Sequence, residues 1–323
     1  MKTRVGFIGC GGISVAHMMR LEQIKGVEFV GMCDIEKGKA EQAAQRYGGK
    51  AYAEFEKMLE EVKMDVCYIC VPPFAHLGQE ELCIEKGIHF FVEKPVHLDL
   101  EKAKNIEREA KAKGIITSAG YVLRYYDIVE EIREIIAKEQ IAFIRGKYYG
   151  GVPWDGKVKW FITKKLSGGQ LVEQSTHTVN LMHYLLGDLE EIFAYKTEGI
   201  FNKIYSGYDV EDSSLLLCKF KDGYIGDLVS TWLWSGFSSS VDIMGKGIEI
   251  NYQGNTLAVN RGNHKIIKVS SVDPMFEENK AFIKAVTEGD PSYIKSDYAD
   301  AVKTLAITLK AHESMENGLP VKI

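Results

Sequence analysis

Segments typical of strands alternate with segments typical of amphipathic helices along the first 120 residues, and this alternation constrains the fold more than any other feature. A short apolar strand at 4–9 leads through a glycine-rich turn into a helix. The later predicted elements are strands at 28–34, 64–71, 88–93 and 115–121 and helices at 37–47, 54–62, 76–86 and 99–113. The pattern predicts a doubly wound parallel sheet, in which ligands bind beyond the carboxyl ends of the strands.

The sequence GCGGIS follows the first predicted strand and is typical of a dinucleotide-binding turn. Gly9 would make the tight turn, and Gly11 would let the main chain approach a pyrophosphate. The helix that starts after Gly12, at Ile13, would offer N–H groups to the phosphates. Because Ser14 stands at the last position of GxGxxG, the match is only to the looser form of this fingerprint.

Asp34 ends the second predicted strand, at about the 20-residue spacing where a Rossmann unit places an acid. Its carboxylate would bind the adenosine ribose hydroxyls and repel a 2'-phosphate. The sequence therefore favours NAD, with NADP as an alternative because the cation of Lys37 is nearby. A structural alternative is that Asp34 only caps the helix predicted at 37–47.

Two further strand ends carry polar or rigid residues. The loop VPPFAH contains Pro72, Pro73 and His76, and the strand at 88–93 ends in a Glu-Lys-Pro motif containing Glu93 and Lys94. A lysine at a strand end is often only solvated surface. In a parallel sheet, however, these ends share one edge with the glycine turn, so we expect these five residues to contact the cofactor.

After residue 121 the pattern changes to a helix at 127–138 and then to successive strand-like runs joined by short turns. Such runs favour a mainly antiparallel sheet. We therefore expect two domains, 1–120 and 121–323, the second an α+β domain with a mainly antiparallel sheet. A long amphipathic helix is predicted to end at Asn317–Gly318.

The segment at 166–187 interrupts the strands with apolar residues at helical spacing. On one helix, Glu173 and His177 would be i and i+4, with Cβ atoms about 5–6 Å apart. They could share a proton. Alternatively, they form an ordinary hydrogen bond on a helix surface.

Together these motifs resemble the Gfo/Idh/MocA oxidoreductases, which include glucose-fructose oxidoreductase and inositol dehydrogenases. The resemblance rests on GCGGIS, Asp34, VPPFAH, the Glu-Lys-Pro motif and GYVLRY at 120–125, and it extends almost from end to end. The family's second signature, Gly-Gly-x-Leu-x-Asp-x-Gly-x-His-x-x-Asp, is matched at Gly168, Gly169, Leu171 and His177. The chain departs from it at Glu173, Ser175 and Asn180.

The resemblance implies hydride transfer between a nicotinamide and a hydroxyl or carbonyl carbon of a sugar, inositol or related polyol. Lys94 would lie beside the nicotinamide, His177 would exchange the hydroxyl proton, and Glu173 would orient His177 and bind a hydroxyl. Tyr121, Arg124 and Trp160 are further candidates for substrate binding; alternatively, each packs in the core. The departures from the signature make the reaction type a firmer expectation than the substrate.

Two rival functions fit the same motifs. The first is an enzyme that retains NAD as a recycled redox agent, as glycosidase-like or intramolecular oxidoreductases do. The second is a non-catalytic sensor that binds a dinucleotide and a protein partner. The presence of Lys94, Glu173 and His177 together argues against the sensor.

Composition excludes other classes of partner. Forty basic and 45 acidic residues leave a net charge of −5, and no block of like charges suggests nucleic-acid binding. No apolar run approaches the ~20 residues of a membrane span, and no signal-peptide pattern precedes the first strand, so we expect a cytoplasmic protein.

The six cysteines lack metal-ligand spacing, and Cys67 and Cys70 are expected to be core thiols. No metal is predicted; a homodimer or homotetramer through the open sheet is implied by the resemblance.

Overall fold

The computed structural model describes residues 2–152 and 159–323, which divide into two compact units by their contacts. Unit 1 contains residues up to Tyr125 together with Asp273–Val302, and unit 2 contains Tyr126–Val272 together with Lys303–Ile323. The sequence suggested a single division after residue 120. In the structure the segment 273–302 returns to unit 1.

Unit 1 is built on a six-stranded sheet with the order β3-β2-β1-β4-β5-β6, and all neighbouring strands are parallel. Its strands are β1 (Thr3–Ile8), β2 (Val27–Cys33), β3 (Lys50–Tyr52), β4 (Val66–Ile69), β5 (His89–Val92) and β6 (Thr117–Ala119). The predicted parallel, doubly wound sheet is confirmed. The short edge strand β3 was not expected from the sequence.

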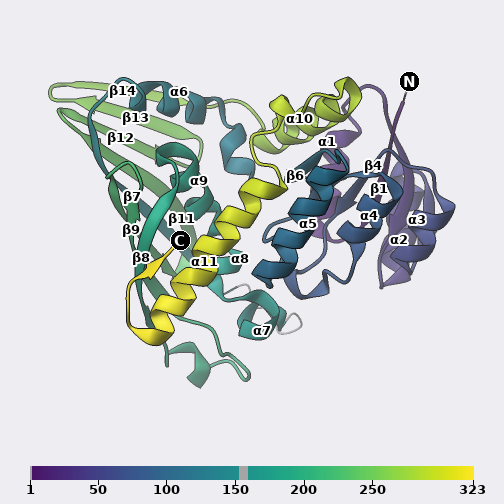
Figure 1. Ribbon diagram of the computed structural model, residues 1–323, viewed down its shortest axis with the longest axis horizontal. Helices are drawn as coiled ribbons and strands as arrows, with labels where there is room; N and C mark the ends of the chain where they lie inside the picture. Colours follow the sequence, from purple (N-terminus) through teal and green to yellow (C-terminus); the bar gives the residue numbers. More distant parts are fainter. Residues whose placement is uncertain (1, 153–158) are drawn as a thin grey trace. The chain divides into compact units, whose positions relative to one another are not determined.

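Helices cover both faces of this sheet (Figure 1). They are α1 (Gly12–Leu21), α2 (Lys37–Tyr47), α3 (Phe55–Glu61), α4 (Gln79–Lys86), α5 (Leu100–Ala112), α10 (Pro274–Glu288) and the start of α11 (Tyr298–Asn317), with short 3-10 turns η1 (Pro73–Ala75), η2 (Val122–Tyr125) and η5 (Pro291–Tyr293). The α5 helix begins where the Asp99 side chain accepts hydrogen bonds from two main-chain N–H groups of its first turn.

The return of 273–302 to unit 1 has a simple cause in packing. Phe282 of α10 is fully buried and packs edge-on against Tyr68 and obliquely against Phe91, which stack on each other with ring centroids 4.8 Å apart. Burying one phenylalanine contributes roughly 1.5–3 kcal/mol, so α10 is held by the core of unit 1 despite its place late in the chain.

Unit 2 is built on a nine-stranded sheet with the order β14-β13-β12-β11-β7-β10-β9-β8-β15. Its strands are β7 (Ile141–Gly151), β8 (Leu189–Thr197), β9 (Ser213–Phe220), β10 (Ile225–Thr231), β11 (Leu233–Gly245), β12 (Ile248–Gln253), β13 (Thr256–Arg261), β14 (His264–Val269) and β15 (Val321–Lys322). The predicted, mainly antiparallel sheet is confirmed, with one parallel pair, β7 and β10. The strand β13 was not expected.

One face of this sheet packs on helices, among them α9 and the end of α11. Met182 of α9 and Ile307 of α11 line a small apolar space with Leu216 and Leu228 of the sheet. The helices of unit 2 are α6 (Asp127–Ile136), α7 (Lys164–Ser167), α8 (Gln170–Glu173), α9 (Thr176–Leu186) and the 3-10 turns η3 (Trp160–Ile162) and η4 (Phe201–Lys203). Within the two described stretches of chain, no helix is both long and apolar enough to cross a membrane.

The sequence predicted a single helix within 166–187, with Gly168 and Gly169 at its entry, and the single helix is wrong. Gly168 and Gly169 have φ of 79° and 89° and separate α7 from α8. The α8 helix then ends at Glu173, and a new helix, α9, starts at Thr176. Around this break the Ser175 N–H donates to the Gln170 carbonyl, five residues back, and the His177 N–H donates to the Gln174 carbonyl, three residues back. Glu173 and His177 therefore belong to different helices.

Candidate functional site

Five adjacent strands of unit 1 end in residues that the sequence singled out. In sheet order, β2 is followed by Asp34, β1 by Gly9, β4 by the Pro72 loop, β5 by Lys94 and β6 by Tyr121. All these strands are parallel, so their carboxyl ends share one edge. Neighbouring strands are about 4.8 Å apart, so the ends of β2 and β5 are separated by about 15 Å. The structure thus brings the predicted cofactor residues together along one edge.

The glycine turn packs closely against the end of β4. Gly9 has φ of 89°, and a Cβ there would overlap the carbonyl of Cys70. By contrast, a Cβ at Gly11 or Gly12 would meet no atom of the described residues within 4 Å. The main chain at these two positions thus faces open space at the start of α1, where no side chain caps the helix. Such an arrangement fits a bound phosphate.

The Asp34 carboxylate is held by the main chain on both sides. One oxygen accepts the Cys10 N–H of the glycine turn at 2.8 Å, and the other accepts the Glu36 N–H at 2.8 Å. Asp34 does not cap α2, because the residue before the first turn of that helix is Glu36. The nearby cation of Lys37 pairs with Glu41 at 3.2 Å.

The Pro72 loop leads into a buried pair of ionisable side chains. Pro73 begins the turn η1, and the His76 Nδ1 atom bonds to the Glu80 carboxylate inside unit 1. Burial by itself would raise the pKa of Glu80, but the charge and hydrogen bond of His76 lower it overall. His76 is therefore fixed by a carboxylate beneath the loop, and the His97 ring lies 5.9 Å away between centroids.

The cysteines of unit 1 are core thiols rather than reactive groups. All six cysteines of the chain are free and buried. Burial and the neighbouring Glu93 raise the pKa of Cys70 well above its usual value, and burial beside Asp34 raises the pKa of Cys10 to about 12. Such thiols stay protonated and chemically inert at neutral pH.

Lys94 lies two residues after Val92, the last residue of β5, and is half-buried. Its N–H donates to the Glu93 carboxylate at 3.1 Å, and the following bond to Pro95 is cis. Glu93 points inward and is 9% exposed. The motif therefore combines an inward carboxylate with a lysine that keeps part of its surface accessible.

Tyr121 and Arg124 are both buried in unit 1. The Arg124 guanidinium pairs with Asp300 at 2.7 Å and donates to the Lys295 carbonyl at 2.6 Å. These contacts tie η2 to the segment that returns from the end of the chain. Arg124 thus has a structural role in unit 1; its role in substrate binding stays a prediction.

In unit 2 the residues of the second signature cluster around Glu173, which is buried at the end of α8. The Gln174 amide donates to the Glu173 carboxylate, and the Tyr148 hydroxyl donates to the Gln174 oxygen at 2.8 Å. Burial, with the Glu173 charge as a second cause, raises the pKa of Tyr148 well above its usual value, so it remains a donor. His177 is half-buried in the first turn of α9.

Sequence analysis missed two members of this cluster, Tyr148 and Glu211. Glu211 is buried, and its carboxylate accepts the Leu171 N–H at 3.0 Å. Tyr148 comes from β7 and Glu211 from the loop before β9, so neither is close to the signature in sequence. The only sequence signal is a cluster of three acids, Asp209, Glu211 and Asp212, shortly before the apolar residues at 215–217.

Two other residues have partners elsewhere in unit 2. Asn180, which replaces an aspartate of the family signature, is buried and donates to the Thr304 hydroxyl at 2.9 Å. Trp160 stacks on its neighbour Phe161, with ring centroids 3.7 Å apart.

The sheet order 3-2-1-4-5-6, the glycine turn and the acid after β2 define a dinucleotide-binding protein of the Rossmann class. Comparison with protein families gives the assignment. Residues 3–121 match the model described as the Gfo/Idh/MocA oxidoreductase family with an NAD-binding Rossmann fold, and residues 129–250 match a Gfo/Idh/MocA C-terminal domain. The chain belongs to the Gfo/Idh/MocA family of oxidoreductases.

Relatives with curated names span nearly the same length. A myo-inositol 2-dehydrogenase from Thermotoga maritima is 24% identical over 99% of this chain and 98% of its own. A scyllo-inositol 2-dehydrogenase (NAD(+)) from Bacillus subtilis is 27% identical over 100% of this chain and 96% of its own. Among solved structures, levoglucosan dehydrogenase in complex with NADH has a TM-score of 0.90 at 19% identity, covering 100% of this chain and 99% of its own.

Proposed function

We propose that this protein is an NAD-dependent dehydrogenase that oxidises a secondary hydroxyl of an inositol, sugar or related polyol. The observation that carries the proposal is the row of five strand ends in unit 1. In this row Asp34 follows β2, and Lys94 follows β5, which lies three strands away in the sheet. Relatives named as inositol dehydrogenases support the substrate class.

The residues of unit 1 fit a bound NAD. The open main chain at Gly11 and Gly12 would hold the pyrophosphate, with Ile13 in the first turn of α1. Asp34, oriented by two main-chain N–H groups, would accept bonds from the ribose hydroxyls. Pro72, Pro73, His76 and Glu93 would support the nicotinamide half. Bound NAD would supply the hydride acceptor.

The chain's own residues would handle the proton and the charge of the reacting hydroxyl. His177 would take the hydroxyl proton as a general base. Lys94 would stabilise the negative charge that develops on that oxygen. Glu173, held by Gln174 and Tyr148, would orient His177 and bind a neighbouring hydroxyl. Tyr121, Arg124 and Trp160 complete the proposed substrate residues.

The assignment is tested by absorbance at 340 nm with NAD and, separately, NADP across a panel of inositols, aldoses, amino sugars and sugar acids. We expect one group of substrates to reduce NAD, with turnover lost in Lys94→Ala and His177→Ala while NAD affinity changes little. Wild-type rates in both variants would overturn the assigned roles.

The same panel separates the alternative in which NAD is retained and recycled. If the purified protein carries nicotinamide that survives gel filtration, and substrate is converted without net absorbance change, the retained-cofactor enzyme is favoured. Dinucleotide binding without conversion of any substrate would instead favour a sensor.

We also propose a homodimer or homotetramer formed through the open face of the nine-stranded sheet. On that face Phe193 pairs with Leu217, and Tyr195 with Leu215, across β8 and β9. Tyr195 and Leu217 are 55% and 44% exposed. An apolar patch of this kind is typical of an interface between subunits. The six free thiols suit a reducing compartment, and we propose the cytoplasm.

A further inference from the structure

A buried hydrogen-bonded chain lies behind Lys94, and only its first member, Glu93, has a role in the proposed reaction. Glu93 accepts the Lys94 N–H with Oε2 at 3.1 Å, and its Oε1 lies 2.9 Å from the His17 Nε2. The other ring nitrogen of His17, Nδ1, lies 3.0 Å from the Asn279 Oδ1. His17 and Asn279 are fully buried.

The orientation of Asn279 determines where the protons lie. Its Nδ2 donates to the Met275 carbonyl at 2.7 Å, so Oδ1 faces His17 and must accept a proton from Nδ1. If neither the His17 Nε2 nor the Glu93 Oε1 carried a proton, these two acceptors would repel each other at 2.9 Å. One further proton therefore lies between the His17 Nε2 and the Glu93 Oε1, whichever atom holds it.

The neighbouring residues Gly120 and Phe91 pack closely around Glu93 and His17. A Cβ at Gly120 would come within 2.8 Å of the Glu93 carboxylate, so the glycine leaves the space that the carboxylate fills. The His17 ring packs edge-on against Phe91, with centroids 4.8 Å apart. With water excluded, leaving either partner without its hydrogen bond would be strongly unfavourable.

The three residues come from three distant parts of the chain. His17 is on α1, the helix that begins at the glycine turn; Glu93 directly follows β5; and Asn279 is on α10. A second contact, Arg20 to Asp273 at 2.9 Å, also joins α1 to the start of α10.

We propose that His17, Glu93 and Asn279 form a positioning triad that fixes the Lys94 peptide relative to the glycine-turn helix. The inference rests on the role proposed above for Lys94. Neither His17 nor Asn279 touches the reacting atoms; both act through Glu93. The triad would keep the lysine and the dinucleotide loop in one fixed relationship during turnover.

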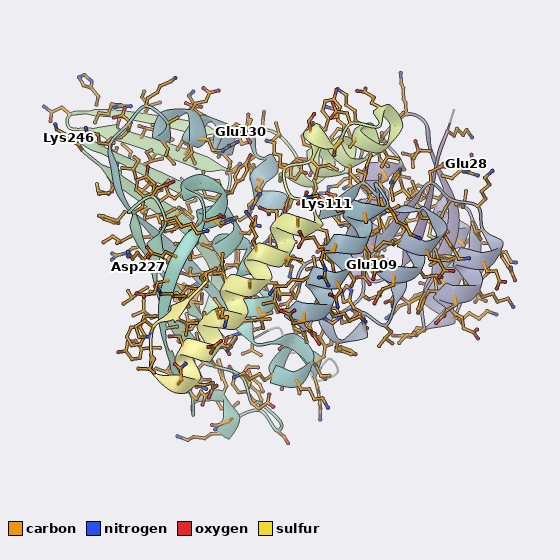
Figure 2. All side chains as sticks on the ribbon, in the orientation of Figure 1. Glu28, Glu109, Lys111, Glu130, Asp227 and Lys246 are labelled. Atoms are coloured by element: carbon orange, nitrogen blue, oxygen red, sulfur yellow. The ribbon has the colours of Figure 1, made fainter. Side chains whose placement is uncertain are left out.

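Two substitutions at one position test the geometry. In Glu93→Gln, the amide can donate to a neutral His17 Nε2 and accept from the Lys94 N–H, so both bonds survive. In Glu93→Asp, the carboxylate is one methylene shorter and cannot reach both partners from the same main chain. Glu109→Asp makes the same change at an exposed position, labelled in Figure 2.

The readouts are turnover, NADH affinity and hydrogen exchange of the Lys94 N–H in the enzyme without substrate. For Glu93→Asp we expect about 10- to 100-fold loss of turnover and at least about tenfold faster Lys94 exchange, the effect of losing one buried charged hydrogen bond. The NADH dissociation constant of Glu93→Asp, measured alongside, separates a loss of cofactor binding from a loss of turnover. In Glu93→Gln both hydrogen bonds survive, so Lys94 exchange should stay within about threefold of the wild-type rate. Glu109→Asp should match the wild type.

The Glu93 N–H, which donates to the Ile69 carbonyl at 2.9 Å, serves as an internal reference for exchange. Faster exchange confined to Lys94 supports the triad. An equal rise at both amides, unchanged exchange in Glu93→Asp, or equally fast Lys94 exchange in the two Glu93 variants would overturn it. If Lys94→Ala keeps wild-type turnover, the role of Lys94 fails, while the exchange measurement still decides the triad by itself.

Discussion

The carboxylate of Glu211 occupies the space that a side chain at Gly169 would need. A Cβ at Gly169 would overlap the carboxylate oxygens, and one of these accepts the Leu171 N–H at 3.0 Å. Gly169 also has φ of 89°, a conformation that favours glycine. The glycine pair of the second signature therefore admits a buried carboxylate that holds the start of α8, the helix that carries Glu173.

Replacing Gly169 should therefore lower the free energy of unfolding by more than backbone strain alone would. Gly207 has a similar φ of 83°, but a Cβ there would meet nothing within 4 Å. We expect Gly207→Ala to lower the free energy of unfolding by about 1–2 kcal/mol. Gly169→Ala should lower it by a further ~1–3 kcal/mol and reduce turnover, because Glu211 must move. Urea unfolding and steady-state rates measure both; equal effects of the two substitutions would contradict the account.

Asp34 is expected to determine the choice between NAD and NADP. Asp34→Ser removes the charge that would repel a 2'-phosphate, so kcat/KM for NADP relative to NAD should rise about 10-fold or more, the effect of ~1.4 kcal/mol. Lys37→Ala is the control, because Lys37 is engaged by Glu41 and should change the ratio little. A ratio that stays at the wild-type value in Asp34→Ser would remove Asp34 from the cofactor site.

Glu278 should make the protein less stable as the pH rises. The side chain is fully buried, and burial, with the charge of Glu93 as a second cause, raises its pKa well above the usual range. Above about pH 4.3 the unfolded chain releases this proton while the folded chain retains it, so the free energy of unfolding falls as pH rises toward the folded pKa.

Glu278→Gln removes this dependence and should flatten the decline by up to about 1.4 kcal/mol per pH unit. The measurement is urea unfolding at pH 5, 6.5 and 8. Glu277→Gln, at a partly exposed neighbour that pairs with Lys280, should keep the wild-type slope. An unchanged slope in Glu278→Gln would mean that Glu278 ionises normally in the folded protein.

A charge on the open face of the nine-stranded sheet should break the proposed oligomer. Leu217 lies between Phe193 of β8 and Asp227 of β10, the latter labelled in Figure 2. Leu217→Glu would place a carboxylate in the apolar patch and beside Asp227. We expect light scattering to show a shift from an oligomer toward the 36.3 kDa monomer. Ile204→Glu alters an exposed apolar residue outside the sheet and should leave the mass unchanged; a monomeric wild type would refute the proposal.

The sequence was sufficient to predict features that depend on local pattern. Alternating elements predicted the parallel sheet, and because parallel strands end at one edge, the pattern alone placed the motifs at Gly9, Asp34 and Lys94 along that edge. The inward turn of Glu93 toward His17 could not be predicted, because it depends on how α1 packs against the sheet.

Pattern failed where distant segments decide the conformation. Leu171, Val172 and Val179 fit one helical period, yet the helix breaks between Glu173 and Thr176. Apolar spacing continues across the break because nearly every side chain of both helices is buried. Glu173 and His177 therefore lie on two helices instead of one, and the partners Tyr148 and Glu211 depend on contacts across 26 and 40 positions.

The hydroxyl of Tyr148 gives the sharpest test of how Glu173 is held. Tyr148→Phe removes the donor to Gln174, so the Gln174 amide, and with it the Glu173 carboxylate, loses a fixed orientation. We expect turnover to fall about tenfold, the effect of one buried hydrogen bond worth ~1–2 kcal/mol, with a smaller change in KM. Tyr149→Phe removes a hydroxyl from the next residue of β7, whose side chain lies on the opposite face of the sheet. Because Tyr149 is remote from Glu173 on that face, its loss should leave turnover near the wild-type value. Equal losses in both variants would indicate that β7 as a whole, rather than the Tyr148 hydroxyl, supports activity.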